Sequence, residues 1–234
     1  MSLTQEVSSQ IDEIFKTQWQ ERDGNVVPEA ENVGLGNDAV RLEGTVLYAD
    51  LADSTLMVNT QPAWFAAEVY KSYLVSACRV IRANGGVITA FDGDRVMAVF
   101  IGSNKNTSAA ITALKLNYVV SQIINPKLTA KYPQQNYHIR QVVGIDTSKL
   151  FVARTGIRGS NDLVWVGRAA NYAAKLSSIN DPGYPSFITE DVFNRLEKHA
   201  KFGNNGTGQL MWESRTFQPL GISVYRSNWR WNPS

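Results

Sequence analysis

The 234-residue sequence has few members of several residue types, and each scarcity argues against a class of protein. Its single cysteine, Cys78, cannot form a disulfide within one chain, which fits a reducing cytoplasm. Two histidines give little support to a zinc site or to a Cys–His nucleophile. A formal net charge of +2 at pH 7 argues against a dedicated nucleic-acid-binding protein. We therefore expect a cytoplasmic protein with no nucleic-acid partner.

Long apolar runs and glycine-rich phosphate loops are also missing. No run approaches the roughly 20 apolar residues that cross a bilayer, and residues 1–6 lack the basic start and apolar stretch of a signal peptide. Neither a Walker loop nor a GxGxxG after a strand is present. A hydrophobic fraction of 44% still suffices for one sizeable core. We expect no membrane association and three parts: an N-terminal helix and linker (1–40), a central domain (41–200) and a β extension packing on it (201–234).

Apolar spacing predicts the elements of the first half. An amphipathic helix ending near residues 23–24 carries an apolar stripe, a polar linker follows to residue 37, and residues 44–50 form a buried strand. A long helix opens at Thr60 and Pro62 and stops at residues 85–86. A hairpin pairs residues 87–91 with 95–100, and its turn around Asp92-Gly93 favours positive φ at both central positions. The stripe of the first helix consists of Val7, Ile11, Ile14, Phe15 and Trp19.

In the second half, Asn106 is expected to cap a helix that ends at Asn125-Pro126. Strands follow near residues 138–145, 150–155 and 163–166, with Asp146 as a turn or strand-end residue, and then a helix over residues 168–179. The resulting βαββαβ order predicts a ferredoxin-like α+β fold, with an antiparallel sheet and helices on one face. The aromatic residues of the tail, 224–231, are expected to pack along a last strand.

Two aspartates at the ends of apolar strands form the main candidate site. Neighbouring strands would bring Asp50 and Asp94 together, and burying two carboxylates is costly without a positive partner. With the Leu51 carbonyl they would make an oxygen site for Mg²⁺ or Mn²⁺, and two such ions could bridge a triphosphate. The turn that carries Ser54 and Thr55 offers N–H groups to the phosphates. Alternatively, either aspartate is a turn or cap residue.

Asn171 and Lys175 form a second polar pair. They lie four residues apart, so a helix presents them on one face. Taken alone, this pair is equally consistent with the solvent-exposed polar face of a helix that has no functional role.

Three segments, 46–55, 91–100 and 165–176, resemble the class III nucleotidyl cyclases, and the likeness extends from about Glu43 to Leu196. The resemblance implies that two metals bind at the aspartates, that Asn171 positions the ribose and that Lys175 stabilises the pentavalent phosphorus. Lys175 stands where the family usually has arginine, so it keeps the charge but loses the planar fork. The resemblance also implies a homodimer whose sites are shared, with metals from one subunit and the Asn–Lys pair from the other.

The positions that read a purine in this family correspond to Ala90 and Val164, neither of which can hydrogen-bond. Tyr48 and Arg95, together with segments 144–147 and 153–159, resemble the pyrimidine cyclases of Pycsar anti-phage defence. That likeness implies cyclic UMP or cyclic CMP as the product and a downstream effector gated by it. Tyr48 would shrink the base pocket, and Arg95, which has only donors, suits the two carbonyls of uracil. Alternatively, Tyr48 is a core aromatic residue and Arg95 a surface residue.

We therefore predict a uridylate cyclase that converts UTP to cyclic UMP and pyrophosphate with two Mn²⁺ or Mg²⁺ ions per site. The first alternative is a cytidylate cyclase acting on CTP, and the second is a promiscuous adenylate cyclase. A catalytically silent nucleotide-binding module is the alternative from another class. The sequence names neither the activating signal nor the effector.

Overall fold

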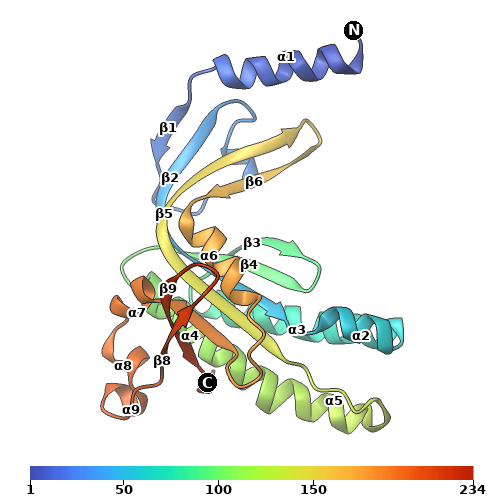
Figure 1. The fold of residues 1–234 in the computed structure, drawn as a ribbon, viewed down its shortest axis with the longest axis vertical. Coiled ribbons are helices and arrows are strands. Elements are labelled where there is room, and N and C mark those ends of the chain that lie inside the picture. Colours follow the sequence, from blue (N-terminus) through green and yellow to red (C-terminus); the bar gives the residue numbers. More distant parts are fainter. Residues whose placement is uncertain (234) are drawn as a thin grey trace. The chain divides into compact units, whose positions relative to one another are not determined.

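A computed structural model describes residues 1–233 of the chain. The chain divides into two compact units, one made of residues 1–43 and 149–167, the other of residues 44–148 and those from 168 onward. Figure 1 shows the elements. The helices are α1 (Leu3–Lys16), η1 (Ala30–Asn32), α2 (Ser54–Thr60), α3 (Ala63–Ala83), α4 (Lys105–Tyr118), η2 (Val119–Ile124), α5 (Asn125–Lys131), η3 (Pro133–Gln135), α6 (Arg168–Ser177), α7 (Glu190–Asn194), α8 (Lys198–Lys201) and α9 (Gly203–Gly206). The strands are β1 (Gln20–Asp23), β2 (Asp38–Leu51), β3 (Val87–Asp92), β4 (Arg95–Phe100), β5 (Gln141–Ile157), β6 (Ser160–Val166), β7 (Ser186–Thr189), β8 (Glu213–Phe217) and β9 (Ile222–Ser227).

The strands follow the predicted ferredoxin-like order. In the sheet they run β3-β4-β2-β5-β7-β9-β8, while the chain passes through β2, α3, β3, β4, α4 and β5. The first four strands of that spatial order are the βαββαβ core, so the predicted fold class is confirmed. The sheet is not wholly antiparallel, because β5 and β7 pair in parallel.

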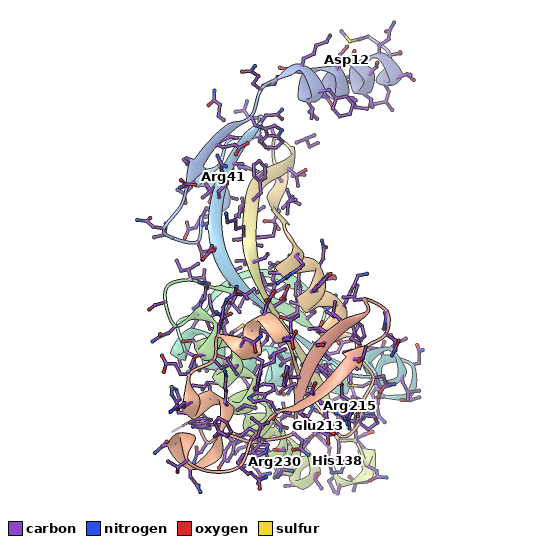
Figure 2. The ribbon with its side chains drawn as sticks, turned by 60° about the vertical axis from the view of Figure 1, so that its left-hand side comes forward. Asp12, Arg41, His138, Glu213, Arg215 and Arg230 are labelled. Atoms are coloured by element: carbon purple, nitrogen blue, oxygen red, sulfur yellow. The ribbon has the colours of Figure 1, made fainter. Side chains whose placement is uncertain are left out.

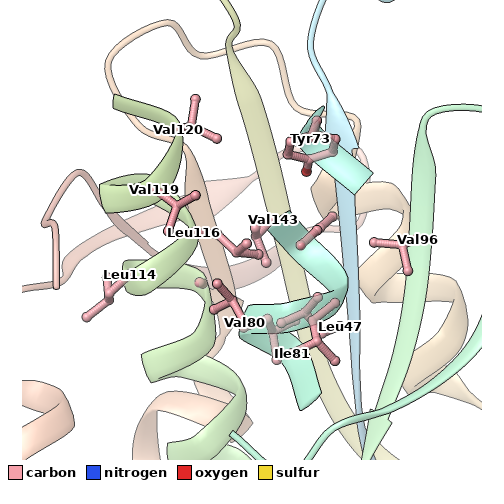
Figure 3. Close-up of a cluster of buried hydrophobic side chains, with 14 of the residues drawn as sticks. Leu47, Tyr73, Val80, Ile81, Val96, Leu114, Leu116, Val119, Val120 and Val143 are labelled. Carbon is pink, nitrogen blue, oxygen red and sulfur yellow. The ribbon is translucent and has the colours of Figure 1, made fainter. Parts of the chain in front are cut away.

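Helix α3 supplies much of the core of the larger unit. It begins after Pro62, as predicted, and its stripe of Phe65, Val69, Tyr73, Ala77 and Val80 is buried. Figure 3 shows Tyr73 and Val80 beside side chains from β2, β4 and β5. The 3.6-residue period therefore identified both the helix and its buried face.

Helices cover both faces of the sheet, which corrects the expectation of a single helical face. Val143 and Ile145 of β5 belong to the core shared with α3 and α4. Val142 packs instead with Leu176 of α6. Because side chains alternate along a strand, α6 lies on the opposite face.

The N-terminal helix is shorter than predicted. It ends at Lys16, and residues 20–23 form β1, which pairs in parallel with residues 38–41. Trp19 is therefore not part of the stripe; its ring meets Phe151 edge-on with centroids 5.0 Å apart. No residue of α1 is buried, and Figure 2 shows its side chains, Asp12 among them.

Two expectations for the helix after residue 104 were wrong. Asn106 is not its cap: it is buried inside α4 and accepts a hydrogen bond from the Thr45 hydroxyl at 2.9 Å. The helix also continues past Pro126, through the π-helical η2 into α5. Proline has no N–H to donate, and a wider turn before it, with Pro126 in the first turn of α5, avoids the lost bond.

The two strands expected near 138–145 and 150–155 are one strand, β5, and Asp146 lies inside it rather than at a turn. Arg168 and Thr189 bind the Asp146 carboxylate, which permits an aspartate at a buried strand position.

The prediction of a β3–β4 hairpin is confirmed, but its turn is centred one residue after the predicted Asp92-Gly93. Asp92 pairs with Arg95, so Gly93 and Asp94 are the central residues. Only Gly93 has positive φ, +61°.

The C-terminal aromatics pack on the core, but Trp229 and Trp231 follow the last strand, which ends at Ser227, instead of lying along it. Trp229 and Trp231 lie against the core, and β9 pairs with both β7 and β8. No helix within residues 1–233 has the length and apolar character needed to cross a bilayer.

We expect Phe65→Ala to lower the free energy of unfolding by about 3–5 kcal/mol, because the fully buried ring leaves a cavity. Trp64→Ala is the matched control: the adjacent ring is 52% exposed, and its loss should cost much less. Urea denaturation of both variants measures the difference. Equal losses would contradict the packing described for α3.

Candidate functional site

Tyr48, Asp50 and Arg95 form one contact group at the ends of β2 and β4. Tyr48 and Asp50 share a face of β2, and the β2–β4 register places Arg95 beside them. Arg95 Nε and Nη2 lie 3.1 and 3.0 Å from Asp50 Oδ2, and its guanidinium carbon lies 5.9 Å from the Tyr48 ring centroid. The structure thus brings together three of the predicted site residues, and Arg95 is not a free surface side chain.

The Asp50 carboxyl is 15% exposed. Burial raises its pKa above the ordinary value; the Arg95 charge opposes that rise, and the Asp94 charge adds to it. The two aspartates therefore interact electrostatically, as expected for a shared site. Leu51, whose carbonyl is the third candidate ligand, directly follows Asp50 at the end of β2.

Asp94 carries the clearest sign of a missing positive partner. Its Oδ2 atom is buried and has no hydrogen-bond partner among residues 1–233. A buried carboxylate oxygen without a donor is costly, and a cation is the usual remedy. This fits a hard divalent ion such as Mg²⁺, which binds one or two carboxylates and completes its shell with substrate phosphates and water. Within residues 1–233 no group of three or more Asp, Glu, His or Cys side chains could hold a metal, so such an ion would depend on the two aspartates, a carbonyl and the substrate.

Two tyrosines of α3 border the aspartates, and the sequence analysis assigned them no role there. Burial raises the pKa of Tyr73 well above its ordinary value, and the negative charges of Asp50 and Asp94 add to the rise. Its hydroxyl has no hydrogen-bond partner in the described chain. Burial and the Asp94 charge also raise the pKa of Tyr70, and its interaction with Ser54 opposes that rise. The helical period predicted Tyr73 only as a core residue, because the spacing of a buried stripe does not show which groups the tyrosine hydroxyl faces.

The turn after β2 is tied to the start of β5. Asp53 adopts the left-handed conformation (φ +59°) and precedes α2, a short helix that the sequence did not predict. Arg140 Nη1 lies 3.0 Å from Asp53 Oδ2, and the Ala52 N–H donates to the Arg140 carbonyl at 2.9 Å. Ser54 and Thr55 are the first residues of α2, where backbone N–H groups have no intrahelical acceptor.

Asn171 and Lys175 lie on the outward face of α6, and both are exposed. No direct contact joins them to Asp50 or Asp94 within the described chain. Lys175 does share a cavity of about 630 Å³ with Arg95, within the range of small-molecule pockets. One chain thus places the candidate base reader and the candidate phosphate-binding lysine around the same space.

A buried ion pair, which the sequence analysis missed, holds the start of α6. Asp146 is fully buried; Arg168 Nε donates to its Oδ2 at 3.0 Å, and Thr189 donates to Oδ1 at 2.5 Å. Burial raises the pKa of Asp146, and these hydrogen bonds oppose the rise. Gly144 permits the close approach, because a Cβ there would lie 2.2 Å from the Ala173 carbonyl oxygen. The pairing spans 22 residues, so no local pattern reveals it.

No protein-family model matches the sequence. Curated relatives do: the chain is 50% identical over 233 residues to a uridylate cyclase of Xanthomonas perforans and 48% identical over 233 residues to a uridylate cyclase of Burkholderia cepacia. Each alignment covers 99% of this chain and 99% of the relative.

Two solved structures with the same fold are nucleotide cyclases. A bacterial light-regulated adenylyl cyclase matches with a TM-score of 0.68 and 21% identity over 83% of this chain, which corresponds to 54% of that protein. The guanylyl cyclase Cya2 matches with a TM-score of 0.67 and 19% identity over 82% of this chain and 95% of its own. At these identities the likeness establishes the fold.

We expect Arg95→Met to raise the pKa of Asp50 further, because the guanidinium is the main favourable charge beside that carboxylate. Carboxyl-carbon NMR titration of the metal-free protein measures the change. Arg195→Met, which removes an exposed arginine of the same unit, should leave the Asp50 titration in place. A lower or unchanged pKa in Arg95→Met would contradict the contact.

Proposed function

The chain belongs to the uridylate cyclase family of class III nucleotidyl cyclases, and from that premise we propose that it converts UTP to 3′,5′-cyclic UMP and pyrophosphate. It is a nucleotide cyclase by its full-length likeness to these relatives. The choice of UTP rests on that likeness and on the placement of Tyr48 and Arg95. The structural observation that carries the catalytic proposal is the buried Asp94 Oδ2, which has no hydrogen-bond partner among residues 1–233 and whose carboxylate acts on the pKa of Asp50.

Asp50, Asp94 and the Leu51 carbonyl would hold two divalent ions, Mn²⁺ or Mg²⁺. When bound, such ions polarise the triphosphate and lower the pKa of the attacking hydroxyl. Arg95 now occupies Asp50 Oδ2, so it supplies the positive charge that an ion would provide at that oxygen. A cation at Asp50 would release the guanidinium toward the base.

The reaction joins the 3′-hydroxyl oxygen to the α-phosphorus while the bond from that phosphorus to the β-bridging oxygen breaks. The hydroxyl proton passes to solvent water, and pyrophosphate leaves. Lys175 would stabilise the charge on the pentavalent phosphorus, and Asn171 would orient the ribose. Ser54 and Thr55, at the start of α2, would donate backbone N–H groups to the β- and γ-phosphates.

Tyr48 and Arg95 would read the base. The Tyr48 ring is half-buried beside the guanidinium, so it narrows the space available to a base. Arg95 has five N–H donors and no acceptor, which matches the two carbonyl oxygens of uracil better than the amino group of cytosine. CTP remains the alternative substrate by this criterion.

We also propose a homodimer with two shared sites, in which each subunit's aspartates work with the partner's Asn–Lys pair. The exposed outward face of α6 supports this arrangement. The Arg95–Lys175 cavity within one chain supports the competing arrangement, in which a single chain completes its own site. As a signal, the product would act in anti-phage defence by opening or activating a cyclic-nucleotide-gated effector.

Incubation of the purified protein with Mn²⁺ and each of ATP, GTP, CTP and UTP should yield one cyclic product, cyclic UMP, identified by mass together with pyrophosphate. Asp94→Asn should abolish it, because the ion loses a ligand. Asp92→Asn changes an exposed carboxylate of the same hairpin and should keep most of the activity. Cyclic CMP would refute the base assignment, an active Asp94→Asn would refute the metal site, and release of no cyclic product from any triphosphate would favour a silent binding module.

Mixing two inactive variants distinguishes shared sites from sites within one chain. If sites are shared, a heterodimer of Asp94→Ala and Lys175→Ala has one intact site, and random exchange restores about a quarter of wild-type activity. If each chain completes its own site, the mixture stays inactive. Mixing wild type with Lys198→Ala, an exposed lysine outside the candidate site, should keep full activity and shows that the mixing procedure does not itself inactivate the protein.

A further inference from the structure

A second polar cavity lies in the larger unit, away from the catalytic residues. Its volume is about 240 Å³, and it lies between the helical segment α4–η2–α5, the start of β5, the 181–185 loop and the C-terminal segment. None of the nine candidate site residues lines it. The lining residues that matter below are Asn117, Asn125, Arg140, Gln141, Asp181 and Arg230.

Gln141 is the one wall residue whose buried side-chain amide lacks a partner within residues 1–233. The residue is only 4% exposed, and neither its Oε1 nor its Nε2 atom has a hydrogen-bond partner in the described chain. It shares a strand face with Val143, which packs under the helices, so its side chain points toward the helical wall of the cavity. An unpaired buried amide is costly, so a ligand that pairs with it would bind favourably.

The side-chain amides of Asn117 and Asn125, which also line the cavity, are already hydrogen-bonded. Asn117 Nδ2 donates to the carbonyls of residues 228 and 229 at 2.9 and 2.8 Å. Asn125 exchanges two hydrogen bonds with the Ile139 backbone, at 3.0 and 2.7 Å. Asp181 accepts from Arg226 at 2.5 Å and is therefore neutralised. Among residues 1–233, Gln141 is thus the buried amide of this wall that can still hydrogen-bond to a ligand.

Arg230 provides a positive charge at the mouth of this cavity. It is exposed and is labelled in Figure 2. Among residues 1–233 it makes no ion pair. The acid nearest to it in the lining, Asp181, is engaged elsewhere. The cavity therefore combines the buried donor and acceptor of Gln141 with an arginine, Arg230, that has no ion-pair partner among residues 1–233. This combination favours a small organic anion.

We propose that this cavity is a second, non-catalytic site for a pyrimidine nucleotide, whose uracil edge pairs with the Gln141 amide and whose phosphate meets Arg230. A primary amide offers a donor and an acceptor side by side, which matches the adjacent N3–H and carbonyl of uracil. The volume accommodates a base and leaves the sugar and phosphate at the mouth. The choice of uracil rests on the proposed function, since the enzyme's own product, cyclic UMP, and cellular UMP share this chemistry.

Arg140 connects this cavity to the turn after β2, which follows Asp50. This residue lines the cavity, pairs with Asp53 at 3.0 Å and donates to Asn180 Oδ1 at 3.0 Å. Its carbonyl accepts the Ala52 N–H. A nucleotide bound in this cavity would contact Arg140, which holds the turn after Asp50 in place. Binding there could therefore regulate the candidate active site through that turn.

Calorimetric titration of the full chain in EDTA, with UMP, cyclic UMP, uridine and inorganic phosphate as probes, tests the proposal. At least one nucleotide should bind at one site per chain, and Gln141→Leu should weaken it by about tenfold or more. Arg230→Gln, a surface change that leaves the fold intact, should weaken the nucleotide and spare uridine. Lys175→Ala should change neither. Stronger binding of cyclic UMP than UMP identifies the product as the ligand, and the reverse identifies a cellular nucleotide.

Two results would overturn the site: no saturable binding of any probe, or binding that Lys175→Ala removes and that both Gln141→Leu and Arg230→Gln leave unchanged. A UTP assay on the same preparation separates this proposal from the proposed function. Turnover of UTP without nucleotide binding in EDTA refutes the second site alone. Binding that depends on Gln141 without turnover refutes the cyclase activity alone.

Discussion

The antiparallel pairing of β2 with β4 determines where the charged groups of the candidate site meet. The register is unbroken from Thr45 opposite Phe100 to Ala49 opposite Val96, so Asp50 and Arg95 come next along the two strands. Most of the paired residues are apolar and buried, and this burial fixes the register. A slip by one residue would turn every side chain of the strand to the other face of the sheet. The pairing of β3 with β4, in which Asp92 lies opposite Arg95, sets the hairpin turn that carries Asp94. Two carboxylates thereby lie near one another in a partly buried place, where their charges require a cation or an arginine.

A second constraint positions the other half of the site. Helix α6 packs on the opposite sheet face because Gly144 leaves room for its backbone and because the buried Asp146 carboxylate binds Arg168 in its first turn. Once the buried face of α6 is set, the helical period places Asn171 and Lys175 outward. The outward face makes them available to substrate held by this chain or by another copy of it.

Local patterns predicted the elements that depend on near neighbours. The buried stripe of α3 and the Asp-Gly hairpin followed from spacing and turn chemistry, and the order of elements then allowed only a few sheet topologies. The errors occurred where distant residues override local preference. Asp146 was read as a turn residue because its partners lie 22 and 43 residues away, and Pro126 was read as a helix end because a π-helical turn leaves no sequence signal.

The sequence by itself determined the class of chemistry: two aspartates after apolar strands, and an asparagine and a lysine four residues apart, are readable because each depends on spacing along one element. Only the tertiary structure decided which hydrogen-bond and ion-pair partners those groups have. Among residues 1–233 it pairs Arg95 with Asp50 and leaves Asp94 Oδ2 without a donor. It also places the Tyr73 hydroxyl where the charges of both carboxylates raise its pKa. The physical reason is that burial and hydrogen bonding are properties of neighbours in space, and those neighbours come from strands and helices far apart in the chain.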